Sequence, residues 1–351
     1  FFTPKTPLPD AATPAERERI ALRQPTMPLT GHVWAAARGK EVYGPLADET
    51  EDLCHDLRVL HWPLAFPAVL ARGGFDAVIG NPPWEVSQLS EKEFFASRAP
   101  EIATLSGAAR KKRIKELPET NPMLWAAYVR EKRKFDCAND YYRGARRFDR
   151  TAKGKLNTYA LFAEAFSTLM RPDGRAGVIL PTGIATDNST AAFFGHLVNE
   201  HKLASLFDFE NRERIFPSVY FRVKFCLLTI GSSDVAVFSF FLTNPVDLQE
   251  KNRRVTLTAD QIARINPNTK TAPIFRSLAD AELTAAIYDH VPVLIKEQPE
   301  EEGGEINPWG LNFQQGLFNM TSASGLFQTA DQLTDAGWQR DGTDWVKGDG
   351  S

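Results

Sequence analysis

Residues 75–84 read Phe75-Asp76-Ala77-Val78-Ile79-Gly80-Asn81-Pro82-Pro83-Trp84, an apolar run that ends in a glycine and two prolines. An apolar, β-rich run bounded by a strong chain breaker predicts a buried strand over residues 75–80. An amide and an aromatic ring then lie just beyond the carboxyl end of this strand, where ligands bind in open α/β sheets. Asn81, Pro82, Pro83 and Trp84 are therefore the first candidates for a functional site.

The composition is that of an ordinary globular protein. The chain has 351 residues, 43% of them hydrophobic, and a formal net charge of −3. That length suits one large core or two smaller ones. The longest apolar stretches, 225–230 and 235–242, are too short to cross a bilayer, so we expect no membrane partner.

The cysteines favour a reducing, cytoplasmic location. Cys54, Cys137 and Cys226 are odd in number and widely scattered, which does not suit a disulfide framework. Cys54, His55 and His61 lie close in sequence but lack the spacing of a zinc site, so we expect no metal.

Positive charge is concentrated in one segment. Residues 110–155 contain 15 Lys and Arg against 6 Asp and Glu, and aromatic residues such as Trp125 and Tyr128 are interleaved with them. Such a patch can neutralise phosphates and stack on bases, and an exposed, solvated helical face explains the same composition equally well. The candidate DNA-binding residues in this segment are Lys111, Lys112, Arg113, Arg146 and Arg147.

Helix and strand patterns alternate after residue 156. Asn157 can cap a helix whose apolar residues recur at spacings of three and four, and Pro172-Asp173-Gly174 is expected to stop it. A second helix is expected from about Asp187–Ser189 and a third over Asp280–Tyr288. The expected strands are Ala176–Leu180, Leu203–Phe209, Arg222–Ile230 and Val235–Leu242.

The short link Gly231–Asp234 constrains the last two of these strands. Parallel neighbours need a crossover of about a dozen residues or more, so we expect this pair to be antiparallel. The pattern predicts an α/β fold, the later half of a Rossmann-like sheet with an antiparallel edge hairpin and helical insertions. We expect a helical or loop segment over residues 1–60, a partial catalytic domain over 61–245 with a basic insertion at 85–155, and a connector over 246–351.

The Asn81–Trp84 motif resembles that of adenine-specific DNA methyltransferases, Asn-Pro-Pro followed by an aromatic residue. The Trp form is most similar to the large type IIG restriction-modification methylases. Residues 75–85, 91–100, 156–166, 174–186 and 203–228 resemble, more narrowly, the methylase of the DISARM phage-defence system. A turn after a strand would also account for Asn-Pro-Pro alone.

The resemblance implies transfer of a methyl group from S-adenosylmethionine to the exocyclic amine of a flipped adenine in double-stranded DNA. The Asn81 oxygen and the Pro82 carbonyl would accept hydrogen bonds from the amine, and two prolines stiffen this pair. Trp84 offers a face on which the base can stack. In that family a second aromatic covers the other face of the base. Phe216 is the candidate, and a core phenylalanine is the equally open alternative.

The cofactor side of such a site is not recognisable in the sequence. These methylases bind S-adenosylmethionine through an aromatic-x-Gly-x-Gly turn, whereas the one Gly-x-Gly here is Gly348-Asp349-Gly350 at the end of the chain. We therefore expect a fragment of an adenine methyltransferase, inactive in isolation, with other defence-system subunits as further partners. The alternatives are methylation of protein glutamine or of RNA, and a non-catalytic DNA-binding or subunit-interaction module with a vestigial motif.

Overall fold

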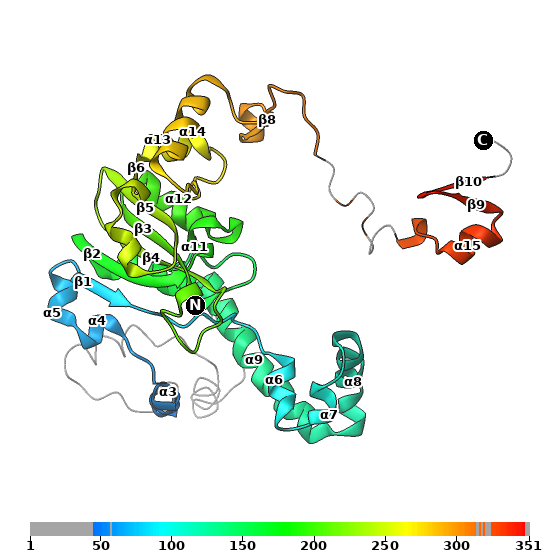
Figure 1. The fold of residues 1–351 in the computed structure, drawn as a ribbon. Coiled ribbons are helices and arrows are strands. Elements are labelled where there is room, and N and C mark those ends of the chain that lie inside the picture. Colours follow the sequence, from blue (N-terminus) through cyan, green and yellow to red (C-terminus); the bar gives the residue numbers. More distant parts are fainter. Residues whose placement is uncertain (1–44, 57, 314–315, 317–318, 320–323, 348–351) are drawn as a thin grey trace. The chain divides into compact units, whose positions relative to one another are not determined.

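The computed structural model describes residues 45–56, 58–313, 316, 319 and 324–347 (Figure 1). It divides into two compact units, Phe1–Gly74 and Phe75–Ser351. The helices described in the first unit are α3 (Pro45–Asp56), α4 (Trp62–Ala65) and α5 (Pro67–Ala71). Residues 1–44 of the expected helical or loop segment and the Gly-x-Gly at residues 348–350 lie outside the described residues.

The second unit contains a six-stranded mixed sheet. Its strands are β1 (Phe75–Gly80), β2 (Met170–Pro181), β3 (Leu203–Glu210), β4 (Lys224–Ile230), β5 (Val235–Leu242) and β6 (Val255–Thr258). Their order in the sheet is β1-β2-β4-β3-β5-β6, so β1 is an edge strand of this sheet. The α/β class expected from the sequence is confirmed.

The pairing of β4 differs from the simplest interpretation of the short link at 231–234. β4 and β5 do run in opposite directions, but β3 lies between them, antiparallel to β4 and parallel to β5. The antiparallel hairpin at the edge of the sheet is instead formed by β5 and β6. A sequence gives the relative direction of two closely linked strands, whereas their neighbours in a sheet depend on residues far away.

Residues 171–174 bulge out of β2 instead of ending a helix in a turn. The preceding helix, α10 (Thr158–Leu169), stops earlier, and the register of β1 against β2 jumps from the pair Phe75–Met170 to the pair Ala77–Arg175. Gly174 allows this bulge because a Cβ there would lie 2.7 Å from the carbonyl oxygen of Phe75.

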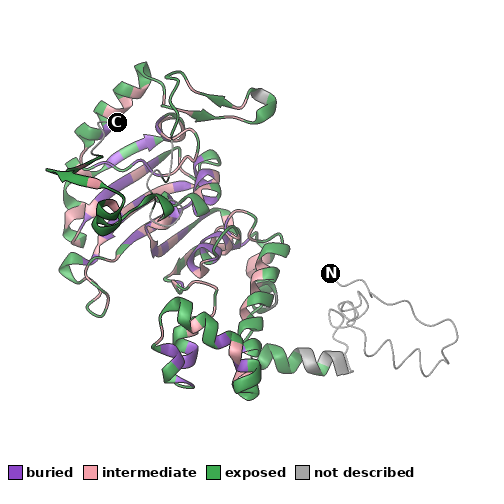
Figure 2. Ribbon diagram, turned by 90° about the vertical axis from the view of Figure 1, so that its right-hand side faces the viewer, coloured by how far each residue is buried: buried purple, intermediate pink, exposed green. Residues whose placement is uncertain are grey.

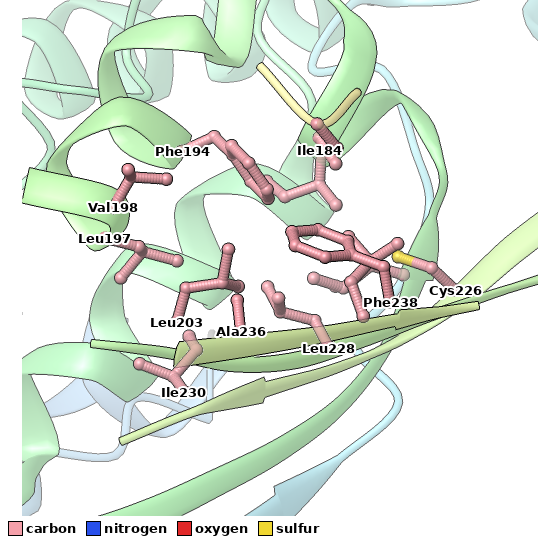
Figure 3. Close-up of a cluster of buried hydrophobic side chains, with 14 of the residues drawn as sticks. Ile184, Phe194, Leu197, Val198, Leu203, Cys226, Leu228, Ile230, Ala236 and Phe238 are labelled. Carbon is pink, nitrogen blue, oxygen red and sulfur yellow. The ribbon is translucent and has the colours of Figure 1, made fainter. Parts of the chain in front are cut away.

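The main hydrophobic core lies between one face of the sheet and the helices packed on it (Figure 3). Phe194, Leu197 and Val198 point from α12 (Ala191–Asn199) towards Leu228 and Phe238 of the sheet. Figure 2 shows this burial as the purple bands of the central strands. The remaining helices near this core are α11 (Gly183–Thr186), α13 (Ala259–Ile265) and α14 (Leu278–His290).

The expected insertion is helical. It contains α6 (Glu91–Ala96), α7 (Pro100–Ala103), α8 (Gly107–Thr120) and α9 (Pro122–Gly144), which share a second small core around Phe95. Its return to the sheet is fixed by Glu164, whose buried carboxylate accepts hydrogen bonds from the Thr151 hydroxyl at 2.6 Å and the Thr151 N–H at 3.0 Å.

Smaller elements complete the described chain. They are the short 3-10 turns Asn188–Thr190, Asn211–Glu213, Pro245–Gln249, Lys251–Arg253, Glu300–Glu302 and Ser324–Leu326, the helix α15 (Ala330–Asp335), and the two-stranded pairs β7 (Lys296–Glu297) with β8 (Glu305–Ile306) and β9 (Trp338–Asp341) with β10 (Asp344–Lys347). In the described part of the chain, no helix is both long and apolar enough to span a membrane. The free cysteines Cys54 and Cys137 are exposed, and Cys226 is buried.

Candidate functional site

A pocket of about 320 Å³ lies at the carboxyl end of β1. It is lined by the motif residues together with one loop and the start of β4: Asn81, Pro82, Pro83, Trp84, Phe216, Val219, Val223 and Phe225. Its volume is at the lower end of the range for small-ligand sites, roughly 300–1,000 Å³. No side chain that lines it is ionisable, so the pocket suits a neutral, largely apolar group.

Both hydrogen-bond acceptors of the motif belong to residues that line this pocket. Asn81 is exposed and Pro82 is buried, and among the described residues neither the Asn81 side-chain amide nor the Pro82 carbonyl forms a hydrogen bond with the protein. Both prolines have a fixed φ and lack an N–H, so this segment cannot join a neighbouring strand through its own amides. The site therefore presents two oxygen acceptors without protein partners beside apolar walls.

Gly80 allows β1 to approach α10 just before the motif. A Cβ at this position would lie 3.1 Å from Cε2 and 3.2 Å from Cζ of the Phe166 ring. The position of Asn81 thus depends on a close contact between a glycine and an aromatic ring.

Trp84 is held between two cores. Its half-buried ring packs against the main core and also against the small cluster of Phe209, Phe225 and Leu242 on the other face of the sheet. Its indole Nε1 is buried and has no hydrogen-bond partner in the described structure. The main-chain carbonyl before it, that of Pro83, accepts a hydrogen bond from the Thr158 hydroxyl at 2.7 Å.

Phe216 also lines the pocket and comes from a loop that is built around one buried amide. Asn211, fully buried, donates through Nδ2 to the carbonyls of Phe216 at 2.9 Å and Val219 at 3.0 Å. Its Oδ1 accepts the Phe216 N–H at 2.9 Å. The Phe216 ring packs edge-on against Phe225, with centroids 5.1 Å apart.

The structure thus brings Phe216 to the same pocket as Trp84, although the two rings make no direct aromatic contact. Sequence reasoning did not identify Thr158 or Asn211. Thr158 follows a helix-cap signal, and Asn211 stands in a polar run after a strand, so neither had a local pattern that distinguished it from an ordinary loop residue. Asn157 itself does not cap α10, and its Oδ1 is buried without a partner among the described residues.

The five candidate DNA-binding residues do not gather in one place. Lys111, Lys112 and Arg113 lie on α8, where Arg113 pairs with Glu116 at 3.0 Å. Arg146 and Arg147 follow α9, a helix of 23 residues that is about 34 Å long at 1.5 Å per residue.

A second pocket of about 530 Å³, which we call the α8–α9 groove, lies beside the first of these groups. Its lining combines an apolar floor with a basic rim: Glu91, Lys111, Ile114, Lys115, Trp125, Tyr128, Val129, Lys132, Arg133 and Asp136. Lys132 is paired with Asp136 at 2.7 Å, whereas Lys111, Lys115 and Arg133 form no ion pair within the described chain. The groove therefore offers unpaired positive charge around a partly buried apolar floor, in which Val129 is exposed, Trp125 is half-buried, and Ile114 and Tyr128 are buried.

The described residues do not form a recognisable site for a metal or for the methyl donor. No group of three or more His, Cys, Asp or Glu side chains among them could hold a metal ion. Among the same residues, no Gly-x-Gly turn joins a strand to a helix, and the pocket at Asn81 has no acidic side chain that could bind a ribose. This part of the chain fits an acceptor amine better than it fits S-adenosylmethionine.

Comparison with protein families finds one match. Residues 32–114 and 127–216, which include the motif, most of the insertion and Phe216 itself, match the Eco57I restriction-modification methylase family. No curated protein matches the sequence.

Several solved structures are similar to parts of the chain. The type I restriction-modification methyltransferase subunit from Streptococcus thermophilus is 12% identical with a TM-score of 0.33, covering 56% of this chain and 37% of its own. A modification subunit of a putative type I restriction enzyme from Vibrio vulnificus is 14% identical with a TM-score of 0.28, covering 73% and 40%. The type IIG restriction endonuclease BpuSI is 20% identical with a TM-score of 0.26, covering 47% and 15%. This chain thus spans less than half the length of each, and TM-scores this low do not by themselves define a shared fold.

Proposed function

We propose that this chain, whose residues 32–114 and 127–216 match the Eco57I restriction-modification methylase family, forms the base-accepting part of a DNA adenine-N6 methyltransferase. The observation that carries the proposal is the pocket at Asn81. Two unoccupied oxygen acceptors lie there beside Trp84 and Phe216, and no charged side chain is present. A neutral aromatic amine is the substrate that such a lining suits.

The chemistry follows from the weakness of the nucleophile. The lone pair of the adenine amine is delocalised into its ring, so a reactive nitrogen requires acceptors that hold both amine protons and draw the lone pair out of the ring plane. The Asn81 oxygen and the Pro82 carbonyl can each accept a hydrogen bond from one of the two amine N–H groups. Holding the amine in line with the donated methyl group lowers the barrier because the reactants no longer lose orientational freedom.

The methyl donor in the proposal is S-adenosylmethionine, which supplies an electrophilic methyl group. The described residues form the acceptor side of the reaction, so transfer is proposed for the full-length protein rather than for this part alone. The isolated fragment is expected to be inactive. The resemblance to type IIG enzymes and to the DISARM methylase supports a role in restriction-modification or phage defence, with other defence subunits as further partners and the cytoplasm as its location.

The aromatic walls would replace the stacking that a base loses on leaving the duplex. Stacking of a base on an aromatic side chain stabilises binding by roughly 1–3 kcal/mol per base. Trp84 and Phe216 contribute to the same pocket, so we propose that an extruded adenine lies between them. Trp84→Phe should then retain most of the activity, whereas Trp84→Leu should lose it.

Double-stranded DNA is the proposed partner of the insertion. The unpaired cations of the α8–α9 groove, Lys111, Lys115 and Arg133, can contact backbone phosphates, while the aliphatic and aromatic floor packs against the sugars. Arg146 and Arg147, at the other end of α9, would contact a separate part of the duplex.

The function is tested by methyl transfer in the full-length protein. With tritiated S-adenosylmethionine and duplex DNA, label should appear in N6-methyladenine, and Asn81→Ala should reduce it at least a hundredfold. Asn252→Ala, an exposed asparagine outside the pocket, is the control and should leave transfer unchanged. If the label appears in protein glutamine or in RNA instead, DNA is not the substrate and the proposed adenine methylation is wrong. DNA binding without any transfer would instead favour a non-catalytic module.

A further inference from the structure

One hydroxyl oxygen holds the backbone on both sides of Trp84. Thr158 Oγ1 donates to the carbonyl of Pro83 at 2.7 Å and accepts the N–H of Glu85 at 3.1 Å. The same residue's N–H donates to the Glu85 carbonyl at 2.9 Å. Trp84 is thus the residue between two peptide groups that are fixed by a single side chain.

This contact belongs to a short paired segment, which we call the neck of the insertion. Val86 and Asn157 form an antiparallel bridge, and the Ser87 N–H donates to the Leu156 carbonyl at 3.0 Å. Thr158 is also the first residue of α10, so its Cα position is set by a helix that packs on the sheet. The hydrogen bonds of this hydroxyl therefore hold the motif backbone at a fixed position relative to α10.

The two prolines leave rotation about ψ free, and the hydrogen bond from Thr158 can restrict it. In Pro82 and Pro83 the ring fixes φ, whereas ψ stays adjustable and decides where each carbonyl points. The hydrogen bond from Thr158 fixes the Pro83 carbonyl, and with it the direction in which the chain continues to Trp84. The preceding Pro82 carbonyl remains without a protein partner at the pocket.

We propose that Thr158 is a positioning residue for methyl transfer, which holds Trp84 and the Pro82 carbonyl in the orientation that the acceptor amine requires. This inference rests on the proposed function. Thr158 does not line the pocket, so it acts through the motif and does not touch the base itself.

The test compares Thr158→Val, which keeps the shape but removes the hydroxyl, with Thr158→Ser, which keeps the hydroxyl. In the full-length protein, we expect valine to lower kcat by roughly 10- to 100-fold, since a displacement of about 1 Å can cost a hundredfold in rate. The KM values for DNA and S-adenosylmethionine should stay within about twofold. Serine should restore kcat to within about threefold.

A matched control separates positioning from stability. Thr190 is a buried threonine whose hydroxyl likewise donates to a backbone carbonyl, that of Gly183 at 2.7 Å, outside the pocket. Thr190 is buried and Thr158 is half-buried, so Thr190→Val should lower the melting temperature at least as much as Thr158→Val, without a comparable loss of kcat. If the valine variant does not fold, Thr158→Ala against Thr158→Ser gives the same comparison.

The outcomes distinguish this inference from the function on which it rests. Wild-type protein that transfers no methyl group to DNA overturns both. Active wild type with an equally active Thr158→Val overturns the positioning role alone. The positioning role is also overturned if Thr190→Val lowers kcat as much as Thr158→Val does. It is overturned as well if Thr158→Ser fails to restore kcat.

Discussion

The side chain of Asn211 closes two hydrogen bonds with the backbone of Phe216, one to its N–H and one to its carbonyl, both 2.9 Å long. The amide thereby takes the place of water as the hydrogen-bond partner of the Phe216 backbone, which is not part of a helix or strand. Because Asn211 is fully buried, each of these groups would lose its partner if the amide were removed.

Asn211→Ala should therefore destabilise the protein by about 2–4 kcal/mol, since an unsatisfied buried polar group costs about 1–3 kcal/mol. The free energy of unfolding in urea measures the effect. Asn268→Ala is the control, because this exposed asparagine similarly bonds the Ile295 carbonyl and the Glu297 N–H, each of which water can replace. Equal losses in the two variants would contradict the role assigned to burial.

Gly80→Ala should lower the free energy of unfolding by about 1–3 kcal/mol, because the added methyl presses on the Phe166 ring at 3.1 Å. Gly177, in the neighbouring strand, has nothing within 4 Å of the same position. Gly177→Ala should be neutral or stabilising by up to about 1 kcal/mol. Thermal and urea unfolding of both variants check this, and a Gly80→Ala protein as stable as wild type would refute the close contact.

Asp208 should make stability fall as the pH rises. Its carboxyl is buried, and desolvation raises its pKa, although hydrogen bonds from the Thr182 hydroxyl and the Phe241 N–H oppose the shift. An acid with a raised pKa in the folded state binds its proton more tightly there. Its contribution to stability is thus fully present below its ordinary pKa of about 4 and is lost as the pH rises through the raised value.

Asp208→Asn, which cannot ionise, should therefore gain stability relative to wild type as the pH rises above the ordinary carboxyl pKa of about 4, measured by urea unfolding at each pH. Asp247 gives the opposite sign as a control. Hydrogen bonds from the Thr243 and Asn244 N–H groups lower its pKa. The stability it provides is lost as the pH falls, so Asp247→Asn should be most harmful near neutral pH. A parallel pH dependence of both variants would contradict these assignments.

The α8–α9 groove should account for part of the salt dependence of DNA binding. Each phosphate contact adds about −0.9 to the slope of log K against log salt. Lys111→Ala with Lys115→Ala should reduce the slope by up to about 2 in magnitude. Binding of a duplex to the chain, measured by fluorescence anisotropy between 50 and 200 mM salt, tests this expectation.

Lys112→Ala with Arg130→Ala is the matched control for the groove. It removes the same amount of charge, with one residue from each of α8 and α9, and neither residue lines the groove or forms an ion pair in the described chain. If both double variants change the slope equally, the effect is one of overall charge and the groove has no special part in binding.

The strands of this fold could be predicted because each is a local apolar run between breakers. β1, β3 and β5 begin and end within one residue of the expected bounds. The position of β3 between β4 and β5 could not be predicted, because it depends on packing among residues that are far apart in sequence. β6 was missed for a related reason. It has only four residues, and the pairing with β5 stabilises it more than its own pattern does.

The motif residues of the site could be predicted because they combine a strand end with rigid breakers. The residues that support the site could not. Asn211 and Thr158 act by bonding the backbone of other segments. Asn211 bonds Phe216, 5 positions away, and Thr158 bonds Pro83, 75 positions away. A polar residue that bonds a distant backbone has the same local sequence pattern as one that bonds water.

The paired neck separates the insertion from the residues that line the pocket. The chain leaves the sheet after Glu85 and returns at Thr158 through hydrogen-bonded neighbours, and no residue that lines the pocket at Asn81 lies between these two points. A change in the length or sequence of the helices in the insertion should therefore leave the lining of the pocket in place, as long as the bond from Thr151 to buried Glu164 is kept.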